Sequence, residues 1–364
     1  MFSALSVVAG FFSAIISIMK IKNSKVGVLL INLGTPDSPS VPDVRKYLRE
    51  FLMDGRVIDV PWLQRFFLVN FIIAPFRAVS SAKIYKHLWT EQGSPLKIYG
   101  YQIRDLLQKA LGDGYAVTFG MRYQSPSIRA ALDELKGEAL SELIVIPLYP
   151  QYASASTGST IEKVFEEIKR WQVVPTVKCI GQFHDDPLFI KAFAELGREY
   201  LKKDNYDHVI FSYHGLPERQ ILKASCQSYC KLSDCCNAYH GKNQYCYRAQ
   251  CFATTRALVK ELGLKEGDYT TSFQSRLGKT PWIKPYTDEK ILELAKQGKK
   301  RILIFSPSFV ADCLETTIEI GVEYQKLFMD NGGQNWTLVE SLNVRPTWVE
   351  CLKNTVKQYE AKGL

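Results

Sequence analysis

Four acidic residues recur at helical spacing after a predicted buried strand. Residues 301–305, with the sequence RILIF, form the nearly continuous apolar run of a strand that is buried on both faces of a parallel sheet. After a turn, the acidic residues share one face of a predicted helix: Asp312, Glu315, Glu319 and Glu323. No Lys or Arg interleaves with them, so a solvated helix face fits poorly. We interpret the ladder as a site that attracts cations and shares protons, at the ligand-binding edge of the sheet.

A histidine follows another predicted strand. Residues 208–213 are mostly apolar, and His214 opens the turn HGLP directly after them. A lone histidine is usually a satisfied core residue. Here the carboxylate ladder also follows a strand end, which favours a cleft shared by the two groups and suited to acid–base work.

Six of the nine cysteines fall within residues 226–251. In a cytosolic chain disulfides are rare, and thiolates at this density indicate a metal. Four thiolates would hold an iron–sulfur cluster or a tetrahedral zinc ion. Cys179, Cys313 and Cys351 are isolated and are interpreted as packing residues.

Strand and helix patterns alternate along the chain, which favours α/β architecture with parallel, doubly wound sheets. Near residues 179–187 the alternation restarts, so we predict two domains. The predicted strands are residues 25–36, 117–123, 142–147, 208–213 and 301–305. The predicted divisions are an apolar segment at 1–24, a first domain at 25–182, a second at 183–343 with the cysteine-rich insertion 226–251, and a C-terminal helix in 344–364 that packs back on the body.

Composition limits the partners. The chain has 364 residues, of which 46% are hydrophobic and 23% charged, as in a soluble globular protein. Its net charge of +9 is spread along the sequence without a compact Lys/Arg block, which argues against a nucleic-acid partner. An anionic small molecule or an anionic membrane surface is the better expectation.

Two apolar segments could contact a membrane. Residues 1–19 carry no charge and are followed by three lysines, so they form either a membrane anchor or an amphipathic or disordered tail. Residues 60–76 are rich in large apolar side chains and form either a core helix or a greasy lip around a pocket for a large flat ligand.

Several motifs together resemble the ferrochelatase family. They lie at residues 212–219, at 274–278 with Pro281 and Trp282, and at 306–316, with further blocks at 32–36, 93–96, 120–123 and 149–152. The resemblance covers roughly residues 25 to 345 in family order. It implies two similar, Rossmann-like, chelatase-type domains that face a porphyrin cleft, and an enzyme that inserts Fe²⁺ into protoporphyrin IX to form protohaem. The alternatives are a coproporphyrin or cobalt chelatase, and a non-catalytic redox sensor that binds porphyrin or haem.

The resemblance also implies roles for single residues. His214 and Glu315 would face one another across the porphyrin, with Asp312, Glu319 and Glu323 behind Glu315 as a polar path for the metal. Relatives that act on coproporphyrin resemble one another in having Tyr at the position of Leu33, so Leu33 favours protoporphyrin. The implied substrate-binding residues are Leu33, Lys83, Ser94, Arg122, Tyr123, Tyr149, Ser275 and Trp282.

Some bacterial ferrochelatases resemble this chain in carrying a 2Fe–2S cluster on an internal cysteine-rich segment. We therefore expect such a cluster, with zinc as the alternative. The candidate ligands are Cys230, Cys235, Cys236, Cys246 and Cys251. We expect a cytoplasmic protein, either monomer or homodimer, that attaches to the cytoplasmic face of the inner membrane.

Overall fold

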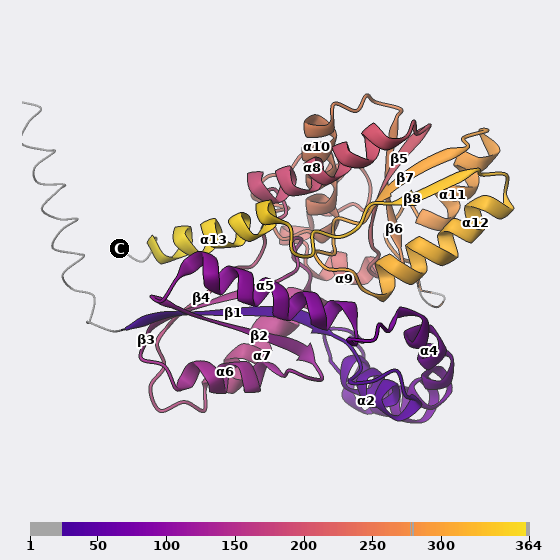
Figure 1. Cartoon of the computed structure of the whole chain (residues 1–364). Coiled ribbons are helices and arrows are strands. Elements are labelled where there is room, and N and C mark those ends of the chain that lie inside the picture. The colour runs from indigo at the N-terminus through magenta and orange to yellow at the C-terminus, as the bar shows by residue number, and fades with distance from the viewer. Residues whose placement is uncertain (1–23, 277, 279, 362–364) are drawn as a thin grey trace, which may run out of the picture.

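Two four-stranded parallel sheets organise the chain (Figure 1). The computed structural model describes residues 24–361 except 277 and 279. The sheets have the orders β2-β1-β3-β4 and β6-β5-β7-β8, so each places its first strand between its second and third. All of these strand pairs are parallel. The predicted pair of similar doubly wound α/β domains is therefore confirmed.

The first sheet is centred on β1 (Lys25–Gly34), which is buried along most of its length, as its run of aliphatic residues requires. Its other strands are β2 (Tyr115–Tyr123), β3 (Leu140–Pro147) and β4 (Thr176–Cys179). The helical segments of this half are α2 (Val41–Leu52), α3 (Trp62–Phe67), the π-helix η1 (Leu68–Ile73), α4 (Ala74–Leu88), α5 (Pro95–Leu111), α6 (Ile128–Lys136), the π-helix η2 (Ser154–Gly158) and α7 (Ser159–Ile168).

The second sheet is centred on β5 (His208–His214), flanked by β6 (Tyr269–Gln274) and β7 (Arg301–Phe305), with β8 (Asn335–Leu338) outside β7. Its helical segments are α8 (Pro187–Lys203), α9 (Glu218–Lys223), the short 3-10 turns η3 (Cys226–Ser228) and η4 (Asp234–Cys236), α10 (Tyr247–Leu262), α11 (Thr287–Lys296), the π-helix η5 (Glu315–Tyr324) and α12 (Gln325–Asp330).

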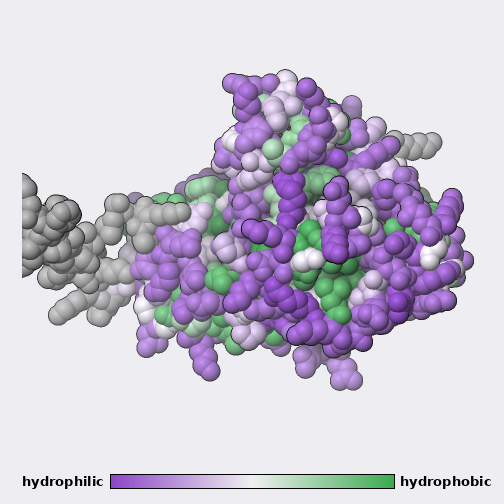
Figure 2. All heavy atoms as spheres, turned by 90° about the horizontal axis from the view of Figure 1, so that it is seen from above, coloured by the Kyte–Doolittle hydropathy of each residue, from purple (hydrophilic) through white to green (hydrophobic). Residues whose placement is uncertain are grey.

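The two halves pack on one another. In Figure 1 the first sheet lies below the second, and the last helix, α13 (Pro346–Ala361), packs against both α5 and α8. On the face drawn in Figure 2 the surface is mostly hydrophilic, and hydrophobic atoms show chiefly within a recess. Residues 1–23, which include the predicted membrane anchor, lie outside the described part of the chain.

A separate apolar cluster joins the halves beside the carboxyl edge of the sheets. It contains buried residues of α2 and α4 together with Tyr123 at the end of β2 and Ile318 of η5, and Leu33 and Leu314 pack against it. Tyr123 and Ile318, which are nearly two hundred residues apart in sequence, therefore share one core. This contact places η5, which carries Glu315, next to the helices of the first domain.

Candidate active site

His214 is the last residue of β5, and its ring has a defined tautomer. The Nδ1 atom lies 2.6 Å from the carbonyl oxygen of Gly215. A carbonyl oxygen only accepts, so Nδ1 carries the proton and donates it, which leaves the lone pair of the neutral ring on Nε2. Position 215 must be glycine because a Cβ atom there would lie 2.7 Å from the backbone oxygen of Gln274. Close packing on Gln274 therefore holds the backbone of Gly215, whose carbonyl oxygen accepts the bond from the imidazole.

Two aromatic rings stand beside His214. The ring centroids of Trp282 and Phe309 lie 6.5 and 6.4 Å from the imidazole. Trp282 is held there because the backbone around it bonds to the turn after β5: Glu218 N–H donates to Pro281 O at 3.0 Å and Ile283 N–H donates to Leu216 O at 2.9 Å. The HGLP turn and the PW motif thus form one unit that presents an imidazole with an aromatic wall.

Glu315 is the first residue of η5 and lies among groups that stay protonated. Burial and then the nearby carboxylate of Glu315 raise the pKa of Tyr85 far above its usual value, and Tyr47 is affected in the same direction by its burial, by Tyr85 and by Glu315. Burial and then Glu315 also raise the pKa of the Cys313 thiol. The Glu315 carboxylate therefore faces potential hydrogen-bond donors from both halves of the molecule.

Asp312 does not belong to the helical ladder that its spacing predicted, because η5 begins only at Glu315. Its two carboxylate oxygens accept hydrogen bonds from Ser341 N–H at 3.0 Å and from the Asn343 amide at 2.8 Å, and its own N–H donates to Asn343 at 3.0 Å. The carboxylate fastens the turn after β7 to the segment before α13. That use of its lone pairs explains why Asp312 stands apart from the helix.

The carboxylate of Glu319 likewise accepts hydrogen bonds from several groups of its own chain. Its oxygens accept hydrogen bonds from Ser275 N–H at 2.8 Å, Ser275 Oγ at 2.6 Å, the Tyr324 hydroxyl at 3.0 Å and the Gln274 amide at 3.3 Å. Ser275, one of the implied substrate-binding residues, thus donates both its N–H and its hydroxyl to Glu319. Glu323 is largely exposed. The partial loss of solvent around its carboxyl group, followed by the charge of Glu319, raises its pKa.

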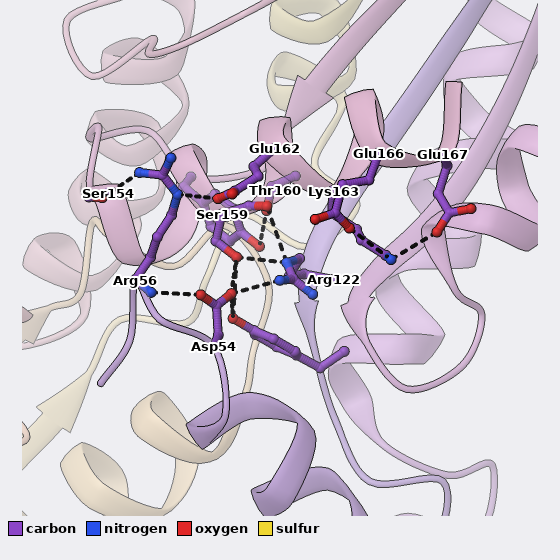
Figure 3. A network of polar contacts seen from close by, with 12 residues as sticks. Asp54, Arg56, Arg122, Ser154, Ser159, Thr160, Glu162, Lys163, Glu166 and Glu167 are labelled. Carbon is purple, nitrogen blue, oxygen red and sulfur yellow. Dashed lines mark hydrogen bonds and ion pairs between the residues drawn. The ribbon is translucent and has the colours of Figure 1, made fainter. Parts of the chain in front are cut away.

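Arg122 takes part in a buried network that the sequence analysis did not anticipate (Figure 3). Its Nη2 atom lies 2.7 Å from Asp54, and its Nε atom donates to Ser159 Oγ at 2.6 Å. Asp54 also accepts from the Tyr123 hydroxyl at 2.9 Å and from Ser159. Burial alone would raise the pKa of Asp54, but these donors, led by Ser159, together with Arg122 hold it below its usual value. Arg122 therefore neutralises a carboxylate of its own chain.

Asp54 was missed because it occurs in MDGRV, a sequence typical of an ordinary turn. The network continues from there to α7, since Arg56 donates to Ser154 at 2.9 Å and pairs with Glu162 (Figure 3). Two other predicted substrate-binding residues contact this network. Tyr123 donates to Asp54, and the Tyr149 hydroxyl accepts from Thr160, the residue after Ser159, at 3.5 Å.

The remaining predicted substrate residues occupy different environments. Lys83 is exposed on α4. Ser94 is 1% exposed and precedes α5, and its hydroxyl has no hydrogen-bond partner among the described residues. Leu33 packs against the apolar cluster that joins the two halves.

The cysteine-rich segment encloses a cavity of about 230 Å³. A hydrogen bond between the thiols of Cys236 and Cys246 raises the pKa of the first and lowers that of the second. Cys251 does not line this cavity: it is fully buried on α10 against Tyr247. The cysteines around the cavity are Cys226, Cys230, Cys235, Cys236 and Cys246. Within residues 24–361, apart from the two gaps, no three His, Cys, Asp or Glu side chains are assembled at metal-binding distances.

One helical segment of the described chain, Trp62–Leu88, is long and apolar enough to cross a membrane. Only 22% of its most apolar window is buried. The exposed apolar side chains on it include Trp62, Phe67, Phe71, Ile72 and Phe76, which is 77% exposed. Residues 60–76 therefore do not form a buried core helix, and many of their large apolar side chains are exposed at the surface.

The chain is similar to known proteins over most of its length. A family model described as Ferrochelatase matches residues 25–360. A ferrochelatase of Legionella pneumophila (strain Lens) is 48% identical over 332 residues, covering 91% of this chain and 98% of the relative. A ferrochelatase of Coxiella burnetii (strain Dugway 5J108-111) is 44% identical over 337 residues, covering 92% and 94%. Among solved structures, SirB from Bacillus subtilis with Fe³⁺ is similar in fold, with a TM-score of 0.52, 12% identity, and 93% and 96% of the two chains covered.

Proposed function

This chain belongs to the ferrochelatase family and inserts Fe²⁺ into a porphyrin for haem synthesis, and we propose that His214 and Glu315 perform the reaction from opposite sides of the macrocycle. The observation that carries the assignment is the hydrogen bond from His214 Nδ1–H to Gly215 O. It reserves Nε2 as a proton acceptor at the carboxyl end of β5, where ligands of α/β sheets bind.

Metal insertion requires that two pyrrole N–H protons leave while the divalent ion enters. We assign proton acceptance to His214, since a neutral imidazole can take and release protons near physiological pH. Trp282 and Phe309 beside it supply an apolar wall for the flat ring. Glu315 is assigned to the metal side, because the carboxylate oxygens of Asp312 and Glu319 already accept hydrogen bonds from within the chain.

The test is anaerobic Fe²⁺ insertion into protoporphyrin, followed by the loss of porphyrin fluorescence. His214→Ala and Glu315→Gln should each lower the rate by ~10²–10⁴, the usual cost of losing one acid–base group. Glu293→Gln on the exposed face of α11 serves as the matched control and should leave the rate unchanged. If either site variant keeps more than about a tenth of wild-type activity, the role assigned to that residue is wrong.

Protoporphyrin IX is the proposed substrate. Leu33 packs with an apolar cluster beside Leu314 and Ile318, an environment suited to the vinyl edges of a dicarboxylate porphyrin rather than to four propionates. Comparison of kcat/KM for protoporphyrin and coproporphyrin tests this choice, and a preference for coproporphyrin would overturn it.

Attachment to the cytoplasmic face of the inner membrane is proposed from the exposed apolar segment α3–η1–α4. Its aromatic side chains would bury their rings in the lipid headgroup region, close to where a poorly soluble porphyrin resides. Fractionation of cells that express the chain without residues 1–22 separates the two candidate anchors. Retention in the membrane fraction would assign binding to α3–α4, whereas release would assign it to the N-terminal segment.

A 2Fe–2S cluster is proposed for the cysteine cavity, held by Cys230, Cys235, Cys236 and Cys246. Three observations support this ligand set: these residues line one cavity, Cys236 and Cys246 are hydrogen-bonded, and Cys230 interacts with Cys235 and Cys236. When bound, the cluster would supply a one-electron redox couple, and the four residues would cross-link the loop.

Anaerobically purified protein should then be reddish-brown, and Cys236→Ser should abolish the colour. Colourless protein with one zinc ion per chain would support tetrahedral zinc instead. Protein without any bound metal would exclude both.

A further inference from the structure

The first turn of α10 binds the ends of several strands that surround the candidate active site. The Tyr247 hydroxyl lies 2.8 Å from the backbone oxygen of His214 and 3.1 Å from Ser308 Oγ. Because the His214 oxygen can only accept, Tyr247 donates to it, and Ser308 donates to Tyr247. One hydroxyl therefore bridges His214, the last residue of β5, and the turn after β7 that leads to Glu315.

The same helix also reaches the first domain. The side-chain oxygen of Gln250, which is fully buried, accepts from Tyr152 N–H at 2.6 Å, and Thr254 lies 3.1 Å from the amide nitrogen of Gln151. These two contacts tie α10 to the segment after β3. The first half of α10 is thus fastened to three strand ends drawn from both halves of the molecule.

We propose that Tyr247 is a positioning residue for His214 and that it makes the orientation of His214 depend on the cysteine loop. The inference rests on the proposed role of His214 in catalysis. The His214–Gly215 peptide is held at both edges, by Tyr247 on the carbonyl and by Gln274, which accepts from Gly215 N–H at 2.8 Å. The imidazole in turn bonds to the next carbonyl, so rotation of this peptide would turn the ring.

The dependence on the loop follows from the position of Tyr247 in the chain. Cys246 is the N-cap residue of α10, so it immediately precedes Tyr247. Its thiol is hydrogen-bonded to the thiol of Cys236, and both residues line the cysteine cavity. The Cys246 carbonyl accepts from Gln250 N–H at 3.0 Å, which starts the helix. A change at Cys236 or Cys246 therefore acts on the residue that begins α10, and Tyr247 carries it to His214.

Tyr247→Phe removes the bridging hydroxyl and keeps the ring. We expect kcat to fall about threefold to tenfold, the fold-change equivalent of one lost hydrogen bond, with KM for porphyrin unchanged. Tyr213→Phe is the matched control, because it removes another buried hydroxyl between β5 and α10, bonded to Thr255 at 2.9 Å. Equal losses in the two variants, or unchanged kcat in Tyr247→Phe, would overturn the positioning role.

A spectroscopic readout is independent of turnover. The chain has five histidines, so ring signals in ¹³C-histidine NMR spectra can be assigned by comparison with His214→Ala. At a fixed pH, the His214 signal should shift in Tyr247→Phe and stay in place in Tyr213→Phe. If His214→Ala proves fully active, the catalytic proposal fails, whereas this signal still decides whether Tyr247 holds the ring.

A double-mutant cycle tests the link to the loop. Cys236→Ser should shift the His214 signal in the wild-type background and have little effect in Tyr247→Phe, because contacting residues in one chain of interactions are non-additive. Additive shifts, or no response of His214 to Cys236→Ser, would overturn the dependence on the loop.

Discussion

Acidification should destabilise this protein through two buried histidines. Burial lowers the pKa of His184 from 6.5 to about 4, with Asp185 opposing the change, and burial with Lys299 lowers that of His208 to about 4. Both rings stay neutral in the folded chain at a pH where the unfolded chain binds a proton. Stability is therefore complete above pH 6.5 and is lost as the pH falls towards the folded pKa of about 4.

The size of the loss follows from these two pKa values. Each pH unit between the unfolded and folded pKa is worth 1.36 kcal/mol, so moving from about pH 7.5 to about pH 5 costs ~2 kcal/mol per histidine and ~4 kcal/mol for both. This is a large part of the ~5–15 kcal/mol that stabilises a typical native protein. His184 is the better ring to replace, because among the described residues neither of its nitrogens has a hydrogen-bond partner.

Urea unfolding at the two pH values provides the assay. His184→Phe should keep the edge contact with Tyr239, whose ring centroid lies 4.8 Å away, and should remove about half of the pH-dependent loss in unfolding free energy. His87→Gln, at an exposed position on α4, is the control and should leave the loss as in wild type. An unchanged pH dependence in His184→Phe would refute the reasoning.

Three further predictions follow from single contacts. Asp54→Asn should lower the unfolding free energy by ~3–5 kcal/mol in urea titrations, because it leaves a buried guanidinium without its carboxylate; a loss below about 1 kcal/mol, the range of surface pairs, would contradict this. Replacing Phe71 and Phe76 by Asp should weaken binding to anionic vesicles in flotation assays while solution turnover is retained, and unchanged flotation would exclude the lip as the contact. Cys251→Ser should keep the visible colour that Cys236→Ser loses, since Cys251 lies outside the cavity, and equal loss would show that the ligand set is wrong.

Much of the fold could be read from the sequence, because buried parallel strands leave continuous apolar runs. The central strands β1, β5 and β7 are such runs and were predicted. β4, β6 and β8 were not predicted. β4 and β8 have only four residues each, and β6 (YTTSFQ) is mostly polar, so their hydrophobic patterns are too short or too weak to identify them.

The sequence alone determined the family, the alternation of strands and helices, and the placement of His214 at one strand end and of Glu315 beyond another, because these depend on local patterns and on motifs in a fixed order. Which carboxylates remain available was decided only by the tertiary structure. Asp312 accepts a hydrogen bond from Asn343, 31 residues away in the chain, and Glu319 accepts one from Ser275, 44 residues away.

The same holds for the contacts that the sequence analysis did not anticipate. Arg122 has the fork of a substrate-carboxylate ligand, yet its carboxylate comes from Asp54, 68 residues earlier. Tyr247 carries no motif that marks it, and its hydroxyl gains a role only because α10 crosses the ends of β5 and β7. Hydrogen-bond partners are chosen by proximity after folding, and the spacing of residues along a chain carries no record of contacts between distant segments.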